Sequence, residues 1–336
     1  MGLAVIRAEN SRQQCQFHRI RRQSYPQKIY EYGLIRKKGN FDFLYEPFRE
    51  EIAAADLSAL NMETPLVENP RMYGDYPSFG TPKEVGEAVS EAGFDIVSCA
   101  NNHCLDRGMT GIDTVAELCE DSGITCCGIQ KSGDREYRPY ELVSKKGIRF
   151  AIFSYTYGIN GNDVSEKYPC AVHMLSEYGA RLKEEGGAED SREADRASFG
   201  TAADQGSFGI TDEQLRADIS RGKAEADIAV VFIHWGTEYE KEPDEVQKYY
   251  AKLLNEAGAD VVIGSHPHVI QPAEVLRNEN GQETLVAYSL GNFRSAQSGE
   301  DTRMGGELCF TVEHTFDGIR ITGWALKEID SFVKSK

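Results

Sequence analysis

Two histidines separated by a single proline stand at the end of an apolar run in the last third of the chain. The stretch VVIGSHPHVIQP covers residues 261–272, and it places His266 and His268 directly after a segment with the composition of a buried strand. The chain has 336 residues and only 7 histidines. Because imidazole nitrogens bind metal ions and exchange protons near neutral pH, this pair indicates a metal site or a proton-transfer site.

Polar residues that bind metals or exchange protons also follow four other apolar runs. They are Glu63 after DLSALN, Asn101, Asn102 and His103 after FDIVSCA, His234 after DIAVVFI, and Asn292 after TLVAYSL. Open α/β sheets form their sites where the carboxyl ends of strands converge, so we expect these side chains to meet in one crevice. A single histidine at a strand end is more often structural, but five such places in succession favour a functional site.

The mixture of donor groups predicts the kind of ion. Three or four imidazoles, a carboxylate and a carboxamide suit a divalent transition ion such as Zn, Mn, Fe or Ni, since ions that prefer oxygen would not select so much nitrogen. A bound ion also supplies local positive charge to a chain whose formal net charge is -17.

The elements that must position these residues alternate between strands and helices. The apolar runs are short and rich in β-branched residues, which is typical of buried strands. Between them lie segments such as PDEVQKYYAKLLNEAG, residues 243–258, in which apolar residues recur on one helical face and Gly258 ends the helix. This alternation predicts an α/β fold.

Two segments depart from the alternation. Residues 1–40 are rich in Arg and Lys, follow no sustained period, and are predicted to be a divergent, weakly structured N-terminal segment. Residues 184–206 are rich in Gly, Ala, Ser and charge, and we expect them to be a mobile surface excursion within a domain that spans residues 41–333.

Composition excludes several classes of function. A length of 336 residues fits one large α/β domain, and a hydrophobic content of 40% argues against wholesale disorder. The net charge of -17 argues against nucleic acid as a partner and against binding to an anionic membrane surface, because both need clustered Lys and Arg.

The cysteines and the N-terminus bear on the compartment. The 8 cysteines contain no CxxC pair and no disulfide-scaffold spacing, so we interpret most of them as reduced core residues. No apolar stretch has the roughly 18 residues of a transmembrane segment, and the N-terminus lacks the apolar part of a signal peptide. The chain as written is therefore expected in the cytoplasm.

Five short motifs occur in the order and spacing of a known family. They are NMETPL at residues 61–66, CANNHCLDRG at 99–108, HWGTEY at 234–239, GSHPHVIQP at 264–272 and YSLGNF at 288–293. With these motifs the chain resembles the bacterial capsule synthesis family associated with poly-γ-glutamate, known as CapA or PGA_cap, a branch of the calcineurin-like metallophosphoesterases. The resemblance covers most of the chain after Asn40 and implies a four-layer α-β-β-α sandwich with two mixed sheets.

The resemblance also implies metal ligands. Glu63 would bridge two ions, and Asn102, His234 and His266 would complete the coordination sphere of one of them. His268 would face the other ion.

His103 has a separate implied role. It would stay unligated and act as a general acid toward the leaving oxygen. The expected activity is metal-dependent hydrolysis of a phosphoester or amide bond in an anionic cell-surface polymer, in its precursor, or in a phosphorylated small substrate. The alternative is a non-catalytic component that binds polymer or capsule-assembly proteins through the same crevice. Members of the family are commonly exported or membrane-tethered.

Further residues are expected to support the site or to contact substrate. They are Asn101, Asp106, Arg107, Tyr155, Trp235, Glu238 and Asn292. Asn292 would shape the site through hydrogen bonds. Asp106 and Arg107 would orient His103 or hold an anion, but the segment LDRGMTGIDT suits a simple helix start equally well.

Aromatic residues at two strand ends leave two interpretations open. Trp235 and Tyr239 would line a substrate groove or would pack as core residues. Tyr155, Tyr157 and Asn160, in SYTYGING, stand after another apolar run and would touch substrate.

The chain departs from its family at the N-terminus. Family members open with a strand that ends in Gly-Asp, and that Asp binds the first metal, but no such pair occurs before Asn40. The ion that this Asp binds would then keep only Glu63 and His268. We therefore expect one tight metal site, and a second site, that of His268, which is weak or absent. The sheet is also expected to lack an interior strand, as though the opening segment had been replaced.

Overall fold

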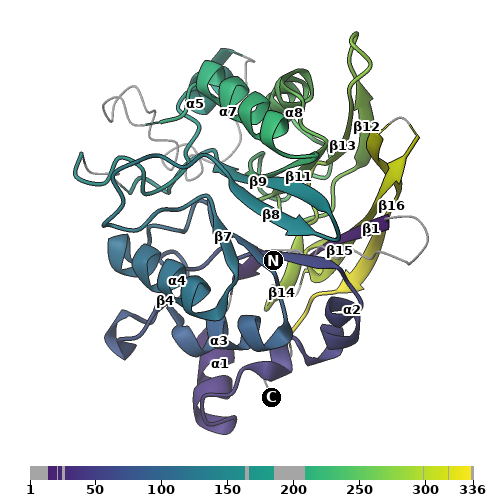
Figure 1. Cartoon of the computed structure of the whole chain (residues 1–336). Coiled ribbons are helices and arrows are strands. Elements are labelled where there is room, and N and C mark those ends of the chain that lie inside the picture. Colours follow the sequence, from purple (N-terminus) through teal and green to yellow (C-terminus); the bar gives the residue numbers. More distant parts are fainter. Residues whose placement is uncertain are drawn as a thin grey trace.

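Two six-stranded mixed sheets form the centre of the molecule (Figure 1). The structure, a computed structural model of the chain, describes residues 14–20, 22–24, 27–162, 166–184, 209–297, 299–316 and 318–333. Within these ranges, side chains are described from Ile29 onward, except at residues 182–184.

The first sheet has the strand order β16-β15-β1-β3-β6-β7. Its strands are β1 (Gln14–Ile20), β3 (Leu57–Asn61), β6 (Ile96–Ser98), β7 (Thr125–Cys127), β15 (Met304–Thr315) and β16 (Gly318–Asp330). The four strands from β1 to β7 run parallel, and β15 and β16 are antiparallel additions.

The second sheet has the strand order β12-β13-β11-β10-β9-β8. Its strands are β8 (Glu141–Lys145), β9 (Ile148–Thr156), β10 (Ile228–His234), β11 (Val261–Ser265), β12 (Ala273–Arg277) and β13 (Glu283–Ala287). The central strands β9, β10, β11 and β13 are parallel, and an antiparallel strand lies at each edge. Two small parallel pairs complete the strands, β2 (Arg22–Ser24) with β14 (Asn292–Ser295) and β4 (Leu66–Val67) with β5 (Thr81–Pro82).

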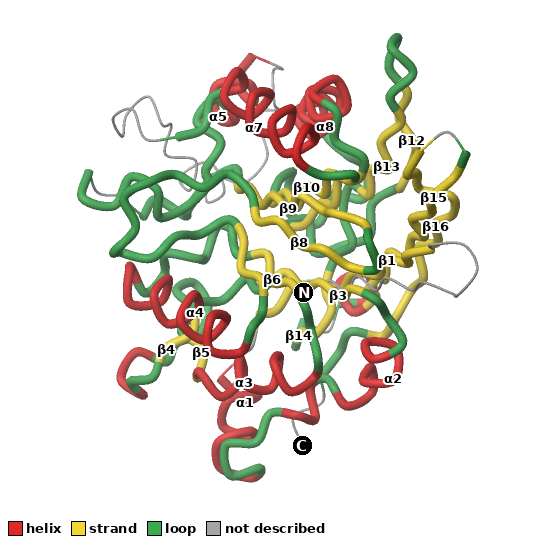
Figure 2. Tube along the Cα trace, in the orientation of Figure 1, coloured by secondary structure: helices red, strands yellow, loops and turns green. Residues whose placement is uncertain are grey.

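Helices cover the outer face of each sheet (Figures 1 and 2). The first sheet is covered by α1 (Gln27–Glu31), α2 (Arg49–Ala53), α3 (Lys83–Ala92) and α4 (Gly108–Ser122). The second is covered by α5 (Tyr178–Glu184), α7 (Asp212–Glu225) and α8 (Glu245–Ala257), and a short α9 (Glu300–Arg303) precedes β15.

Three apolar cores separate the four layers. One lies between the first sheet and its helices, one between the second sheet and its helices, and the third between the two sheets, where Leu57, Phe150 and Phe232 are buried. Alternating residues of β9 serve different cores, because successive side chains of a strand point to opposite faces. The expected four-layer α-β-β-α sandwich with two mixed sheets is therefore confirmed.

The expectation that the sheet lacks an interior strand is wrong. β1 lies between β15 and β3, with Phe17 opposite both Phe310 and Leu57. Its sequence QCQFHRI carries no clear apolar period, so the neighbouring strands determine its conformation rather than its own pattern. A domain boundary at residue 41 stays a prediction, but β1 joins residues on both sides of it in one sheet.

The other predicted elements can be compared directly with the structure. All six apolar runs form strands, and the segment 243–258 forms α8, which ends at Gly258 in the left-handed conformation with φ 100°. Asp244 and Gln247 add a capping box at its N-terminus. The excursion predicted for residues 184–206 lies, apart from its first residue, outside the described residues.

The cysteines with described side chains are free thiols, in agreement with their interpretation as reduced residues. Burial raises the pKa of the Cys104 thiol to about 12. No helix in the described ranges is long and apolar enough to cross a membrane.

Candidate metal centre

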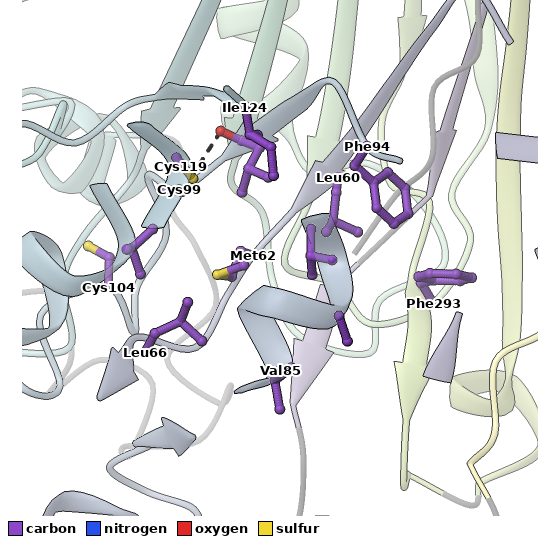
Figure 3. Packing of buried hydrophobic residues seen from close by; sticks show 14 of the residues in the cluster. Leu60, Met62, Leu66, Val85, Phe94, Cys99, Cys104, Cys119, Ile124 and Phe293 are labelled. Atoms are coloured by element: carbon purple, nitrogen blue, oxygen red, sulfur yellow. Dashed lines mark hydrogen bonds between the residues drawn. The ribbon is translucent and has the colours of Figure 1, made fainter. Parts of the chain in front are cut away.

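Strand ends from both sheets deliver the candidate ligands to one place. β3 leads to Glu63 and β6 to the loop that carries Asn102, while β10 ends at His234 and β11 is followed by His266. Apolar neighbours anchor the first two: Met62, Cys99 and Cys104 are buried in the core beneath α3 and α4 (Figure 3). The polar residues are thus fixed by packed residues next to them in the chain.

His234 lies at the centre of the donor set. Its Nε2 is 2.9 Å from Asn102 Oδ1 and 3.5 Å from Glu63 Oε1, and the side chains of Glu63 and His234 are both fully buried. Asn102 directs its oxygen this way because its Nδ2 donates to Asn160 Oδ1 at 3.1 Å. A carboxylate, a carboxamide and an imidazole from three segments therefore converge.

Ser265 sets the protonation of the His234 ring. Its Oγ lies 3.0 Å from His234 Nδ1 and donates to the Ile233 carbonyl at 3.4 Å, so it accepts the Nδ1–H bond. This leaves the Nε2 lone pair facing the oxygens of Asn102 and Glu63. Three lone pairs that face one point need a cation among them, either a proton on Nε2 or a metal ion.

The spacing of these donor atoms fits a metal ion. Two ligands that each lie about 2.1 Å from one ion, at angles between square and tetrahedral, are about 3.0–3.4 Å apart. The distances from His234 Nε2 are 2.9 and 3.5 Å, each about 0.1 Å outside this range. Within the described part of the chain no group of three or more His, Cys, Asp or Glu side chains could hold an ion. The third donor here is the amide of Asn102, which belongs to none of those four types.

His266 lies beside His234 in a strained conformation. The two ring centroids are 4.9 Å apart, and the ring of Tyr157 packs against His266 at 4.7 Å. The φ angles of His266 and His268 are 105° and 61°, values that cost energy for a residue with a side chain and that persist at functional sites. Gly264 permits the close packing that precedes them, since a Cβ there would lie 1.8 Å from the Tyr288 carbonyl oxygen.

His103 and Asp106 form a pair next to the donor set. Asp106 Oδ2 lies 2.7 Å from His103 Nδ1 and also accepts the Phe79 N–H at 2.7 Å. The Phe79 ring packs on the imidazole with centroids 4.5 Å apart. Asn160, which holds Asn102, also places its Nδ2 3.4 Å from His103 Nε2. One amide therefore contacts both a candidate ligand and the candidate acid.

His268 belongs to a second group of side chains. Its Nδ1 lies 3.0 Å from Asn292 Oδ1 and its Nε2 3.2 Å from Glu238 Oε1. Its ring is 6.4 Å from that of His266, centroid to centroid. His268 thus has polar partners different from those of His234, and its assignment to a different ion stays a prediction.

Asn101 and Arg107 brace the surrounding loops. Asn101 donates to the carbonyls of Met62 and Cys99, each at 2.8 Å, and accepts the His103 N–H. Arg107 is the residue before α4, and its guanidinium donates to Met72 O and Ser78 O. These contacts favour the helix start and loop anchoring over a role for Arg107 in holding an anion.

Tyr155 and Trp235 are packed as core residues. Both are fully buried in the core between the second sheet and its helices. Trp235 donates from Nε1 to Tyr288 O at 2.8 Å, and burial raises the pKa of Tyr155 well above its usual value. The open question about Trp235 is answered in favour of packing, and Tyr155 is corrected to a core position.

Sequence reasoning did not find Ser265 or Phe79. Ser265 stands inside the GSHPH motif, and its place before His266 was a usable signal. Phe79 comes from the loop before β5, whose sequence has no feature that relates it to His103.

The chain belongs to the family described as bacterial capsule synthesis protein PGA_cap, whose sequence profile matches residues 15–297. The family resemblance inferred from the motifs is therefore confirmed. The match also includes β1, although that strand carries no Gly-Asp.

Curated relatives carry capsule-related names. The chain is 29% identical over 273 residues to the PGA biosynthesis protein CapA of Bacillus subtilis (strain 168), which covers 80% of this chain and 61% of that protein. It is 26% identical over 258 residues to the capsule biosynthesis protein CapA of Bacillus anthracis, covering 75% and 53%. The chain thus spans between about half and three fifths of the length of these relatives.

Solved structures similar to the chain include two phosphoesterase-type proteins. The calcineurin-like phosphoesterase YfkN of Bacillus subtilis is 13% identical with a TM-score of 0.45 and covers 86% of this chain and 80% of that one. A phosphatase of Mycoplasma pneumoniae is 11% identical with a TM-score of 0.47, covering 93% and 92%.

Proposed function

We propose that this chain is a metal-dependent hydrolase that cleaves a phosphoester or amide bond in an anionic cell-surface polymer or in its precursor. The observation that carries the proposal is the convergence of Glu63, Asn102 and His234 beside the His103–Asp106 pair. Buried ligands next to an acid–base pair are what hydrolysis with a metal ion requires.

Glu63, Asn102, His234 and His266 would hold one divalent transition ion, and His268 would serve a second. When bound, such an ion supplies a Lewis acid for an oxygen of the scissile group. The buried donor set selects an ion of borderline type, because half of its donors are imidazoles.

His103 supplies the proton in this proposal. Because Asp106 is a carboxylate, it accepts the Nδ1–H bond, which leaves Nε2 to give a proton to the leaving oxygen. The same carboxylate pairs with the ring when it is protonated. Phe79 packs on the ring, and Asn160 Nδ2 lies 3.4 Å from Nε2, to which it donates only while that nitrogen carries no proton.

The substrate class follows from the family. The Bacillus subtilis relative is named a PGA biosynthesis protein, and we extend an anionic polymer of this kind, poly-γ-glutamate or a precursor, to this chain. A protein with net charge -17 repels a polyanion over most of its surface, so bound ions would provide the attraction. Cytoplasmic location and contact with capsule-assembly proteins stay predictions, which fractionation and affinity purification would check.

A second candidate is a capsule component that binds polymer without cleaving it. It is favoured by the departure from the family pattern, since no Gly-Asp pair occurs before Asn40 to supply the carboxylate expected for one of the two ions. The two candidates differ in turnover rather than in polymer binding.

The test measures metal per chain and phosphodiester hydrolysis on protein loaded with Mn²⁺ and dialysed. We expect both a bound ion and turnover, with both lost in Glu63→Gln. Glu68→Gln is the matched control, since Glu68 is exposed and pairs only at the surface with Lys83. A bound ion without turnover would support the binding component, and absence of any bound ion would overturn the hydrolase.

A further inference from the structure

The neighbours of His268 determine which of its two ring nitrogens can bind a metal ion. Asn292 Nδ2 donates to the Thr302 carbonyl and to Gln297 Oε1, each at 2.8 Å. A carbonyl oxygen only accepts, so the Asn292 amide must present Oδ1 to His268 Nδ1, and Nδ1 must donate. Nε2 is therefore the nitrogen of His268 that can bind a metal ion.

Glu238 stands directly in front of that nitrogen. Its Oε1 lies 3.2 Å from His268 Nε2. The side chain of His268 is buried, whereas that of Glu238 is 24% exposed. The carboxylate therefore connects the buried imidazole with solvent.

The backbone fixes this pair. Tyr239, the next residue, donates its N–H to the Pro267 carbonyl at 2.8 Å, which ties the loop after β10 to the loop after β11. The Tyr239 ring also stacks on His268, with centroids 5.4 Å apart and an interplanar angle of 17°. Tyr239 and His268 both have positive φ, at 68° and 61°. The strained backbone at Tyr239 and at His268 therefore holds the side chains of Glu238 and His268 facing each other.

We infer that Glu238 is a carboxylate ligand of a second divalent ion whose imidazole ligand is His268. The distance of 3.2 Å between Oε1 and Nε2 is that of neighbouring ligands on one ion, which is about 3.0–3.4 Å. The inference rests on the proposed function and deepens it. It supplies, from the loop after β10, the kind of carboxylate that the sequence lacked when no Gly-Asp was found before Asn40.

A simpler role for the same contact is a structural ion pair that holds the loop after β10. The two roles differ in what they do to metal binding. A structural pair changes the unfolding midpoint when it is broken but leaves the number of bound ions unchanged. A ligand changes the number of bound ions.

The experiment titrates Mn²⁺ into the full chain and counts free ion by electron paramagnetic resonance. Wild type should bind ions in two classes. Glu238→Gln should weaken only the second class, by at least about tenfold, the lower bound for even an outer-shell partner of a metal site. His268→Gln should weaken the same class. Glu240→Gln, an exposed acid on the same loop, is the control and should match wild type.

Each other outcome overturns the inference in a recognisable way. Two classes in Glu238→Gln with wild-type affinities would make the contact a structural ion pair. One class in wild type, unchanged in Glu238→Gln, would leave the proposed function standing and remove the second site. No binding in wild type would overturn both. Circular dichroism on each variant confirms that a lost class is not lost folding.

Discussion

The donor end of the sheets and the core beneath α7 both contain deeply buried histidines, but these histidines have opposite surroundings. At the donor end, His103, His234 and His268 are 4%, 0% and 2% exposed, and each has hydrogen-bonding side chains on its ring nitrogens. In the core, His173 is 3% exposed, and within the described residues no side chain hydrogen-bonds either of its ring nitrogens, whose polar neighbour is the Ser154 backbone.

The core surrounds His173 with aromatic rings. Tyr137 and Tyr155 pack against it with centroids 5.0 and 6.1 Å away. Burial lowers the pKa of His173 to about 3, and the charge of Arg138 acts in the same direction, so the ring stays neutral. Equal burial therefore does not distinguish a functional histidine from a packing one. The side chains that hydrogen-bond the ring nitrogens distinguish the two kinds of histidine.

The largest expected effect comes from His234→Ala. This change removes the nitrogen that faces Asn102 and Glu63, so the tight ion should be lost and turnover should fall to background. His173→Leu is the matched control in the core. It should keep both the ion and turnover, since the replacement is apolar and removes no hydrogen bond to another side chain among the described residues. Metal per chain, measured by elemental analysis, checks both variants, and an ion retained in His234→Ala would break the comparison.

His103→Ala should have a smaller but large effect on rate. We expect turnover to fall by about 10²- to 10⁴-fold, the usual contribution of a positioned acid, while the ion stays bound. The exposed His314, on β15, supplies the control substitution His314→Ala. Turnover with saturating metal and metal per chain are both measured. If the ion is lost with the imidazole, His103 is a ligand and its role as acid is wrong.

Sequence reasoning located the site better than it separated site residues from their core neighbours. It placed Glu63, Asn102 and His234 together because each follows an apolar run, and strand ends converge whatever their side chains do. It named Tyr155 and Tyr157 together, whereas the structure packs Tyr157 against His266 and Tyr155 against His173. The two residues are two positions apart and share one face, so alternation along a strand cannot tell which of them reaches the site.

Two further features could not be predicted from local sequence. β1 was missed because QCQFHRI has no apolar period, and its place is determined by pairing with β3 and β15. The contact of Glu238 with His268 depends on how two loops are tied together through Tyr239 and Pro267. Such contacts between distant segments leave no local pattern to detect.

The smallest expected effect concerns the stability of the folded chain in acid and tests the core side of the comparison. The pKa of His173 is about 3 in the folded chain against 6.5 for an ordinary histidine. Below pH 6.5 the unfolded chain therefore binds a proton at this position that the folded chain does not bind until the pH approaches 3. The free energy of unfolding should fall as the pH falls through this range, by about 2 kcal/mol between pH 7 and 5 from this group alone.

His173→Leu isolates that contribution, because the other titrating groups are the same in both proteins. Urea unfolding, followed by circular dichroism at pH 7, 6 and 5, should show wild type losing stability faster than the variant. The difference between the two slopes should approach one proton, or about 1.4 kcal/mol per pH unit. Parallel slopes would mean that His173 accepts a proton in the folded state, and therefore that it has a partner for that proton. The contrast between partnered histidines at the donor end and a neutral packing histidine in the core would then fail, and His173 would have to be considered beside His103, His234 and His268.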